Sequence, residues 1–119
     1  MEKVAVLGAS AHKERYAYKA FQLLEEKGHQ VFLVNPRESE IEGKKVYPSL
    51  EELSGIDTVT VYLRPAISNQ YKDQLLSLKP KRVIFNPGAE NEELVASLVE
   101  NGIATENACT LILLNTQQF

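Results

Sequence analysis

The sequence contains little of the chemistry that metal centres and disulfide scaffolds require, with one cysteine and two histidines among 119 residues. Cys109 has no second cysteine with which to form an internal disulfide, which agrees with a reducing compartment. His12 and His29 are far apart in the sequence and lack the close ligand spacing of a zinc motif. We therefore expect neither a disulfide framework nor a metal site.

An excess of positive charge and long hydrophobic runs are also missing. The 13 lysines and arginines against 16 acidic residues give a net charge of −3, which argues against a general nucleic-acid binder. The longest apolar runs, "VFLV" at 31–34 and "LILL" at 111–114, fall far short of a membrane span. The first residues show no extended hydrophobic region typical of a signal peptide. We expect a cytoplasmic protein with neither a membrane nor a nucleic-acid partner.

What is present is an ordinary globular composition, with 44% hydrophobic and 24% charged residues. The length of 119 residues predicts one domain spanning 1–119. A nucleotide domain together with a separate catalytic domain would need a longer chain.

Apolar, β-rich segments alternate with helical patterns along the chain, which indicates βαβ units and a parallel sheet. Parallel strands joined by right-handed crossovers wind into an open sheet with helices on both faces. The predicted fold is therefore a three-layer, doubly wound α/β sheet of about five parallel strands, and these strands are expected at 4–7, 31–34, 58–63, 82–85 and 103–105.

The first and last helices have clear boundaries in the sequence. The first ends at Gly28, a residue type favoured just after a helix. The last, over 92–100, follows Asn91, a favoured N-cap residue. The first helix carries one apolar stripe with i, i+3, i+4 spacing, made by Ala17, Ala20, Phe21 and Leu24.

The segments between these helices are more varied. The polar stretch "NPRESEIEGKKVYP" predicts a loop or a small hairpin after the second strand. Ser49 followed by Glu52 matches a capping box and predicts a short helix. A further helix, marked by Ile67, Tyr71 and Leu75, must end by Lys79, before Pro80.

Ligands of doubly wound sheets bind beyond the carboxyl ends of the strands, where the strand order reverses. The residues that directly follow the predicted strands are therefore the candidate site residues. They are Gly8, Ala9 and Ser10; Asn35, Pro36 and Arg37; Arg64 and Pro65; Asn86, Pro87 and Gly88; and Glu106 and Asn107.

The loop after the first strand does not match the dinucleotide fingerprint G-x-G-x-x-G. Ser10 and Lys13 occupy the second and third glycine positions, and the second strand ends in Asn35 and Arg37 instead of a ribose-binding carboxylate. Standard NAD binding is disfavoured. A phosphorylated ligand still fits, because Gly8 permits a close backbone approach and Arg37 can hold a terminal phosphate. NADP, with its 2′-phosphate on Arg37, remains an alternative.

The first helix carries basic residues near its N-terminus, where the helix dipole disfavours them. Lys13, Arg15 and Lys19 surround its start, whereas the last helix begins with Glu92 and Glu93. A bound polyanion would make the basic cluster favourable. We therefore expect Lys13, Arg15 and Lys19 to contact phosphate groups.

Several of these segments together resemble a known family. "VAVLGAS" with the basic segment after it, "VNPR", "VYPSL", "YLRP" and "FNPGAENEEL" are similar to the small stand-alone CoA-binding proteins. These are relatives of the CoA-binding domain of the succinyl-CoA synthetase α subunit. The resemblance covers residues 3 to 109, with the motifs in the order that the family shows.

The resemblance implies a Rossmann-like domain that holds CoA or an acyl-CoA by its 3′-phospho-ADP part. It implies that Gly8, Ala9 and Ser10 lie at the pyrophosphate and that the basic residues after them lie near phosphate. By the same analogy the segment 35–37 lies near the adenosine, Arg64 and Pro65 close one side of the groove, and Asn86, Pro87 and Gly88 line the next edge.

The C-terminus departs from the family, in which a polar segment often follows a cysteine. Here Cys109 is followed by "TLILLNTQQF". We favour the interpretation that this apolar segment packs into the domain's own core. The alternative is that it is available for sheet extension, for a homo-oligomer or for another protein partner. Cys109 itself is expected to be a small buried core thiol.

No catalytic group can be assigned from these patterns, since no base can be paired with Cys109 and His12 lies alone in a loop. We therefore expect a binding module without an activity of its own: a CoA carrier, sensor or regulator. The alternatives are a small NADP-dependent oxidoreductase and a docking subunit with a vestigial nucleotide site.

Overall fold

One mostly parallel sheet forms the centre of the protein, whose computed structural model describes residues 1–119. The strand order is β3-β4-β2-β1-β5-β6-β7, and only the β3–β4 pair is antiparallel. The strands are β1 (Lys3–Leu7), β2 (Gln30–Val34), β3 (Glu40–Ile41), β4 (Lys44–Tyr47), β5 (Thr58–Val61), β6 (Arg82–Phe85) and β7 (Ala104–Asn107).

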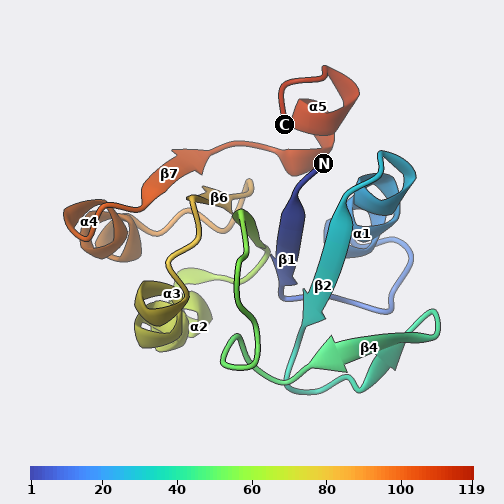
Figure 1. Ribbon diagram of the computed structural model, residues 1–119, viewed down its shortest axis with the longest axis horizontal. Helices are drawn as coiled ribbons and strands as arrows, with labels where there is room; N and C mark the ends of the chain where they lie inside the picture. The colour runs from blue at the N-terminus through green and yellow to red at the C-terminus, as the bar shows by residue number, and fades with distance from the viewer.

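Helices cover both faces of the sheet, as predicted (Figure 1). α1 and α5 pack against one face, and the remaining helices cover the other. No helix has the length and apolar character needed to cross a bilayer. The helices are α1 (Tyr16–Glu26), α2 (Pro65–Ser68), the 3₁₀ turn η1 (Asn69–Tyr71), α3 (Lys72–Leu78), α4 (Glu92–Glu100) and α5 (Thr110–Asn115).

Strand β1 marks the point where the strand order reverses. The chain runs from β1 outward to β2 and then returns to β5 on the other side of β1. In register, Leu7 lies between Val34 and Val61, so the three strands end together. A crevice opens at such a reversal, because the connections leave β1 and β5 toward opposite faces.

The alternation of side chains along the strands divides the core into two layers. Val4 and Val6 of β1 point to the α1 side, where they meet Phe21 and Leu24. Ala5 and Leu7 point to the opposite side, where α3 and α4 pack. The predicted apolar stripe of α1 is confirmed, since Ala17, Ala20, Phe21 and Leu24 are all buried.

The polar segment after β2 forms the small hairpin that was one of its two predicted structures. Ile41 pairs with Lys44, which leaves a two-residue turn of Glu42 and Gly43. Both turn residues have positive φ, 53° and 76°, as a type I′ hairpin turn requires. Because β4 also pairs in parallel with β2, the sheet has seven strands rather than about five.

Three details of the prediction are wrong. No helix follows Ser49: its hydroxyl accepts the nearby Glu51 N–H at 3.3 Å in a tight turn, and Leu50 and Leu53 are drawn into the core. Strand β5 ends at Val61, two residues early. The strand expected at 103–105 instead spans Ala104–Asn107.

The apolar C-terminal segment neither extends the sheet nor buries itself completely. It forms α5, in which Leu114 is buried against the α1 side of the core while Ile112 is 60% exposed. The expectation that it packs into the core is therefore correct for one face of the helix only. The chain then folds back so that the Phe119 ring lies 5.1 Å from the ring of His29.

Candidate functional site

A hollow of 510 Å³ lies at the carboxyl end of β1 and the start of α1, where the strand order reverses. We call it the central hollow. Main-chain atoms of a glycine turn, two arginines and two tyrosines share its wall. The lining residues are Gly8, Ala9, Ser10, His12, Arg15, Tyr16, Ala17, Asn35, Arg37, Glu38, Tyr62 and Leu63.

Gly8 makes the turn from β1 into the central hollow. Its φ is 96°, a region that side chains rarely allow. A Cβ atom at this position would lie 2.9 Å from Leu63 Cδ2 and 3.1 Å from the Tyr62 carbonyl oxygen. Glycine is therefore required by the backbone conformation and by the close approach of the chain that leaves β5.

Asn35 ties two loops of the site together. Its Nδ2 donates to the Ala9 carbonyl at 2.7 Å, and its Oδ1 accepts the Arg37 N–H at 2.8 Å. The loop after β1 and the loop after β2 are thus held in one arrangement without a ligand. This explains why an amide stands where a dinucleotide site would place a carboxylate.

The start of α1 is left uncapped. Arg15 is the N-cap residue and makes no side-chain capping bond, and the first turn contains no acidic residue. At α4, by contrast, the Asn91 side chain accepts the Leu94 N–H, and Glu92 and Glu93 follow. The unsatisfied N–H groups and the positive dipole end of α1 favour an anion beside Ala17.

The arginines divide sharply between the two edges of the sheet. Arg15, Arg37 and Arg64 lie at the carboxyl edge, and none of them forms an ion pair. The fourth arginine, Arg82, begins β6 at the opposite edge and pairs with Glu2 at 3.5 Å and Glu106 at 3.0 Å. Free guanidinium groups therefore gather only where a ligand would bind.

A second hollow, of 420 Å³, continues the crevice toward β2 and α2, and we call it the β2-side hollow. It shares Gly8, Asn35, Arg37 and Leu63 with the central hollow. Its other lining residues are mostly apolar or uncharged: Val34, Pro36, Arg64, Ile67, Gln70 and Tyr71.

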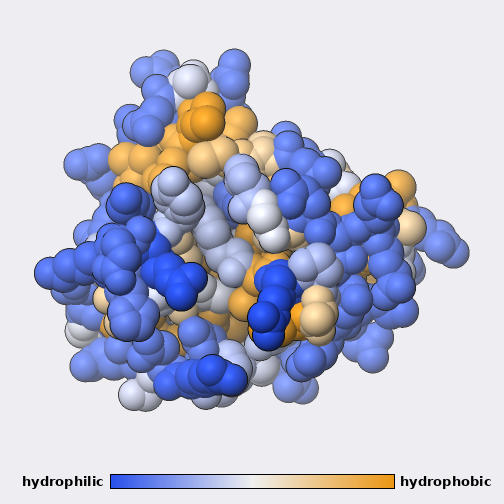
Figure 2. Space-filling model, turned by 180° about the vertical axis from the view of Figure 1, so that it is seen from behind, coloured by the Kyte–Doolittle hydropathy of each residue, from blue (hydrophilic) through white to orange (hydrophobic).

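On the other side, the central hollow meets an apolar groove of 390 Å³ that we call the α5 groove. The two share Tyr16 and Tyr62. Burial raises the pKa of Tyr62 to about 12, so its phenol stays protonated near neutral pH. Figure 2 shows apolar surface over α5 in this region, and the remaining lining residues are Asn86, Pro87, Cys109, Leu111 and Ile112.

The structure brings together ten of the fourteen residues that the sequence singles out as ligand contacts. The central hollow takes six, the β2-side hollow adds Pro36 and Arg64, and the α5 groove adds Asn86 and Pro87. The six residues of the central hollow are Gly8, Ala9, Ser10, Arg15, Asn35 and Arg37.

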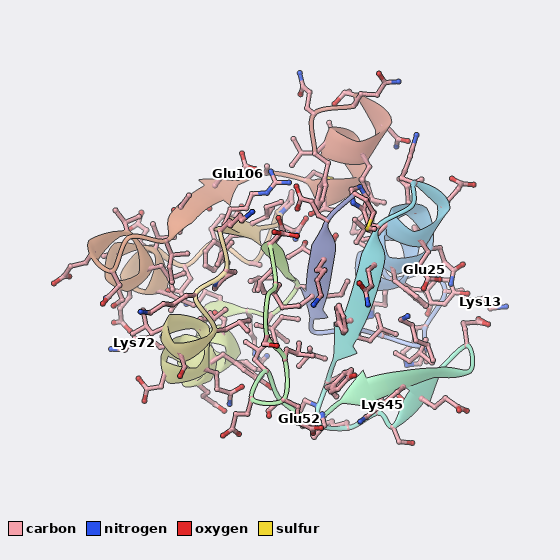
Figure 3. The ribbon with its side chains drawn as sticks, viewed as in Figure 1. Lys13, Glu25, Lys45, Glu52, Lys72 and Glu106 are labelled. Atoms are coloured by element: carbon pink, nitrogen blue, oxygen red, sulfur yellow. The ribbon has the colours of Figure 1, made fainter.

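Four predicted residues lie outside these three spaces. Lys13 and Lys19 border a separate depression on the outer side of α1, and Lys13 points away from the protein (Figure 3). Pro65 occupies the first turn of α2. The Gly88 N–H donates to the Glu90 carboxylate at 2.8 Å.

Asn86 lines the α5 groove but is only 2% exposed, and its side chain is already engaged. Its Nδ2 donates to Thr60 Oγ1 at 2.7 Å and to the Val61 carbonyl at 2.9 Å. Its Oδ1 accepts the Thr110 N–H at 2.9 Å. The residue therefore joins β5, β6 and the start of α5.

Sequence reasoning missed Tyr62, Leu63 and Glu38 as lining residues. The sequence predicts a strand through Tyr62 and Leu63, but the chain leaves the sheet at Val61 and both residues line the crevice. Pro65 is the available signal, because a proline has no N–H to donate and a central strand must therefore end before it. Glu38 follows a polar loop with no distinguishing pattern.

The doubly wound sheet, with its glycine turn and cationic crevice at the strand reversal, defines a Rossmann-like α/β fold. The family described as CoA binding domain matches residues 2–115, so this chain belongs to that family. Membership supports the binding of CoA. The crystal structure of an uncharacterized protein is 44% identical, with a TM-score of 0.95, and the match covers 100% of this chain and 98% of that one.

Two curated relatives share parts of the sequence. The α subunit of acetate–CoA ligase [ADP-forming] II from Pyrococcus furiosus is 36% identical over 63 residues, 52% of this chain but 14% of the subunit. The uncharacterized protein YneT from Bacillus subtilis is 28% identical over 102 residues, 85% of this chain and 76% of that protein. About half of the chain thus matches a small part of the ligase subunit, and most of the chain matches most of the second relative.

Proposed function

We propose that this protein binds CoA, or an acyl-CoA, through its 3′-phospho-ADP part, and that the whole of 1–119 serves as one such binding unit. One observation carries the proposal: three unpaired arginines and an uncapped helix N-terminus surround a single crevice. That arrangement suits a ligand with several phosphate groups.

The two connected hollows suggest how the ligand lies. The pyrophosphate meets the turn at Gly8 and the first turn of α1, where Arg15 and the free N–H groups of the helix are available. The adenosine extends into the β2-side hollow, whose Ile67 and Tyr71 offer apolar contact. Arg37 borders both hollows and is placed to hold the 3′-phosphate.

The proposed role is that of a carrier, sensor or regulatory module rather than an enzyme. The titratable groups around the central hollow are His12, Tyr16, Glu38 and Tyr62, besides the arginines. Tyr62, with its pKa of about 12, cannot accept a proton near neutral pH. His12 is exposed, and its imidazole lies 4.0 Å from the Glu14 carboxylate. Glu14 does not line the hollow, so this contact does not orient the imidazole toward a ligand.

A thermal-shift comparison tests the proposal. Purified protein is heated with CoA, dephospho-CoA, NADP or ATP, each at about 1 mM. A ligand at about 100 times its Kd stabilises the fold by roughly 2.7 kcal/mol, which raises Tm by several degrees for a domain of this size.

We expect CoA to give the largest shift, with dephospho-CoA clearly weaker because it lacks the 3′-phosphate. A shift with NADP alone would replace the proposal with a pyridine-nucleotide protein. No shift with any of the four would contradict ligand binding in the crevice and favour a docking subunit. Turnover is assayed separately, by following acetyl-CoA over hours for release of free thiol, and we expect none above the background rate.

A further inference from the structure

The α5 groove differs in chemistry from the crevice that it joins. Of its seven lining residues five are hydrophobic, and none is charged. The central hollow, in contrast, carries His12, Arg15, Arg37 and Glu38. The two spaces meet at Tyr16 and Tyr62, so a single long ligand can pass from a cationic region into an apolar one.

The apolar side chains of this groove are left in contact with water. Tyr16 is 68% exposed and Ile112 is 60% exposed, and both line the groove. Exposed hydrophobic residues that cluster around a concavity mark a binding surface rather than a random surface position. Covering them with an apolar group would release this surface from water.

The wall formed by α5 is held in place before any ligand arrives. Its first residue, Thr110, is buried, and the Thr110 hydroxyl lies 2.8 Å from the Thr60 hydroxyl. Asn86 accepts the Thr110 N–H at 2.9 Å, and Leu114 anchors the other end of the helix in the core. The groove is therefore preformed, which lowers the entropic cost of filling it.

We propose that the α5 groove holds the apolar acyl chain of an acyl-CoA, and that this protein binds CoA thioesters with a longer acyl chain more tightly than acetyl-CoA. The inference rests on the proposed function, since it requires the phosphates to lie in the central hollow. The order of the three spaces fits the order of groups in the ligand: adenosine in the β2-side hollow, pyrophosphate at Gly8, and the pantetheine arm leading past Tyr62 to the acyl chain.

Isothermal titration with acetyl-CoA and hexanoyl-CoA tests the preference. Burying one methylene group is worth about 0.8 kcal/mol, or roughly fourfold in affinity. Hexanoyl-CoA has four more methylene groups than acetyl-CoA, and a groove open on one side covers them partly. We expect hexanoyl-CoA to bind at least about tenfold more tightly. Equal affinities would overturn this inference and leave the proposed function intact, whereas no binding of either ligand would overturn both.

A pair of matched variants locates the effect. Ile112→Ser removes an exposed apolar side chain from the groove, and Val99→Ser removes one from α4, where Val99 is 56% exposed. We expect Ile112→Ser to bind acetyl-CoA as the wild type does and to lose most of the preference for hexanoyl-CoA. Val99→Ser should keep that preference. Equal behaviour of the two variants would contradict an acyl site in the groove.

Cys109 is half-buried in the groove wall and is not the buried core thiol that the sequence predicted. It supplies a second readout because it lines the groove and is the chain's one cysteine. Both ligands are thioesters without a free thiol, so the reaction of Cys109 with a disulfide reagent can be followed in their presence. Hexanoyl-CoA at saturation should slow this reaction several-fold more than saturating acetyl-CoA. Equal protection would count against the inference, as would a dimer in ultracentrifugation that Ile112→Ser dissociates, because a second copy would then cover the groove.

Discussion

The side chain of Asn35 donates a hydrogen bond to the carbonyl oxygen of Ala9 at 2.7 Å, and this contact joins the ends of β2 and β1. The same side chain accepts the Arg37 N–H at 2.8 Å. One amide thus fixes both the glycine turn and the loop that presents Arg37. The shape of the crevice therefore depends both on the sheet and on the two hydrogen bonds of Asn35.

Asn35→Ala is expected to weaken CoA binding by about tenfold. The two loops would have to be ordered when the ligand binds, at about 0.5–1.5 kcal/mol for each side chain. The free energy of unfolding should fall by about 1–2 kcal/mol, since two hydrogen bonds are lost. Isothermal titration and urea unfolding measure the two effects. Asn101→Ala, which removes an exposed bond to the Ser97 carbonyl, is the control and should leave CoA affinity unchanged.

Gly8→Ala should destabilise the protein by about 2–4 kcal/mol, because both the positive φ and the contact with Leu63 oppose a side chain. Gly102→Ala is the matched control: its φ is 82°, but a Cβ there meets no atom within 4 Å. We expect it to cost only about 1 kcal/mol. Urea unfolding of both variants separates the steric cost from the conformational one, and equal losses would show that the approach of Leu63 is unimportant.

Asn86→Ala should lower the free energy of unfolding by about 2–4 kcal/mol. The substitution leaves the buried Thr110 N–H without its acceptor and removes two donated bonds. For a domain of this size, Tm should drop by roughly ten degrees or more. Calorimetry provides the test. A variant with wild-type Tm and weakened CoA binding would instead make Asn86 a ligand contact.

His29 makes stability depend on pH. Burial lowers the pKa of its imidazole, the N-terminal ammonium and Arg82 lower it further, and Glu2 opposes them. Its Nδ1 accepts the Glu2 N–H at 3.0 Å, which requires that this nitrogen carries no proton and that the imidazole is neutral. Because the folded-state pKa of His29 lies below the ordinary histidine value of about 6.5, the unfolded chain binds a proton more readily than the folded protein. His29 therefore contributes fully to stability above about pH 6.5, and this contribution is lost as the pH falls through the lower folded-state pKa.

The urea midpoint of the wild type should therefore fall between pH 7.5 and pH 5.5. His29→Gln has an acceptor for the same N–H but does not titrate in this range. We expect its midpoint to change less over the same interval. An equal change in both proteins would mean that other groups control the pH dependence.

Much of the fold could be predicted from the sequence. The apolar runs at 4–7, 31–34 and 82–85 form strands, and the apolar stripes of α1 and α4 agree with the residues at the ends of these helices. The prediction failed where tertiary contacts decide the local structure. Leu50 and Leu53 are pulled into the core, and the Leu50 N–H donates to the Gln74 side chain at 2.9 Å, so the expected helix does not form.

The candidate site could be predicted in outline, since residues after parallel strands meet at one edge. Which cations enter the crevice could not be predicted. Arg15 sits at the N-cap of α1 and lines the central hollow, whereas Lys13 and Lys19 lie on the outer side of the same helix. That difference depends on the path of the loop from Ser10 to Arg15, which sequence spacing does not fix.

The most direct test of the account is a titration of CoA and dephospho-CoA into the wild type and Arg37→Ala, with Lys19→Ala as the control. A charge-assisted bond is worth about 1.5–3 kcal/mol, so the loss of either the 3′-phosphate or Arg37 should weaken binding about tenfold or more. Dephospho-CoA should bind to Arg37→Ala only slightly more weakly than CoA does, because the two groups act through the same contact. Lys19→Ala should bind both ligands with the affinity of the wild type. Equal affinity of the wild type for CoA and dephospho-CoA would contradict recognition of the 3′-phospho-ADP part.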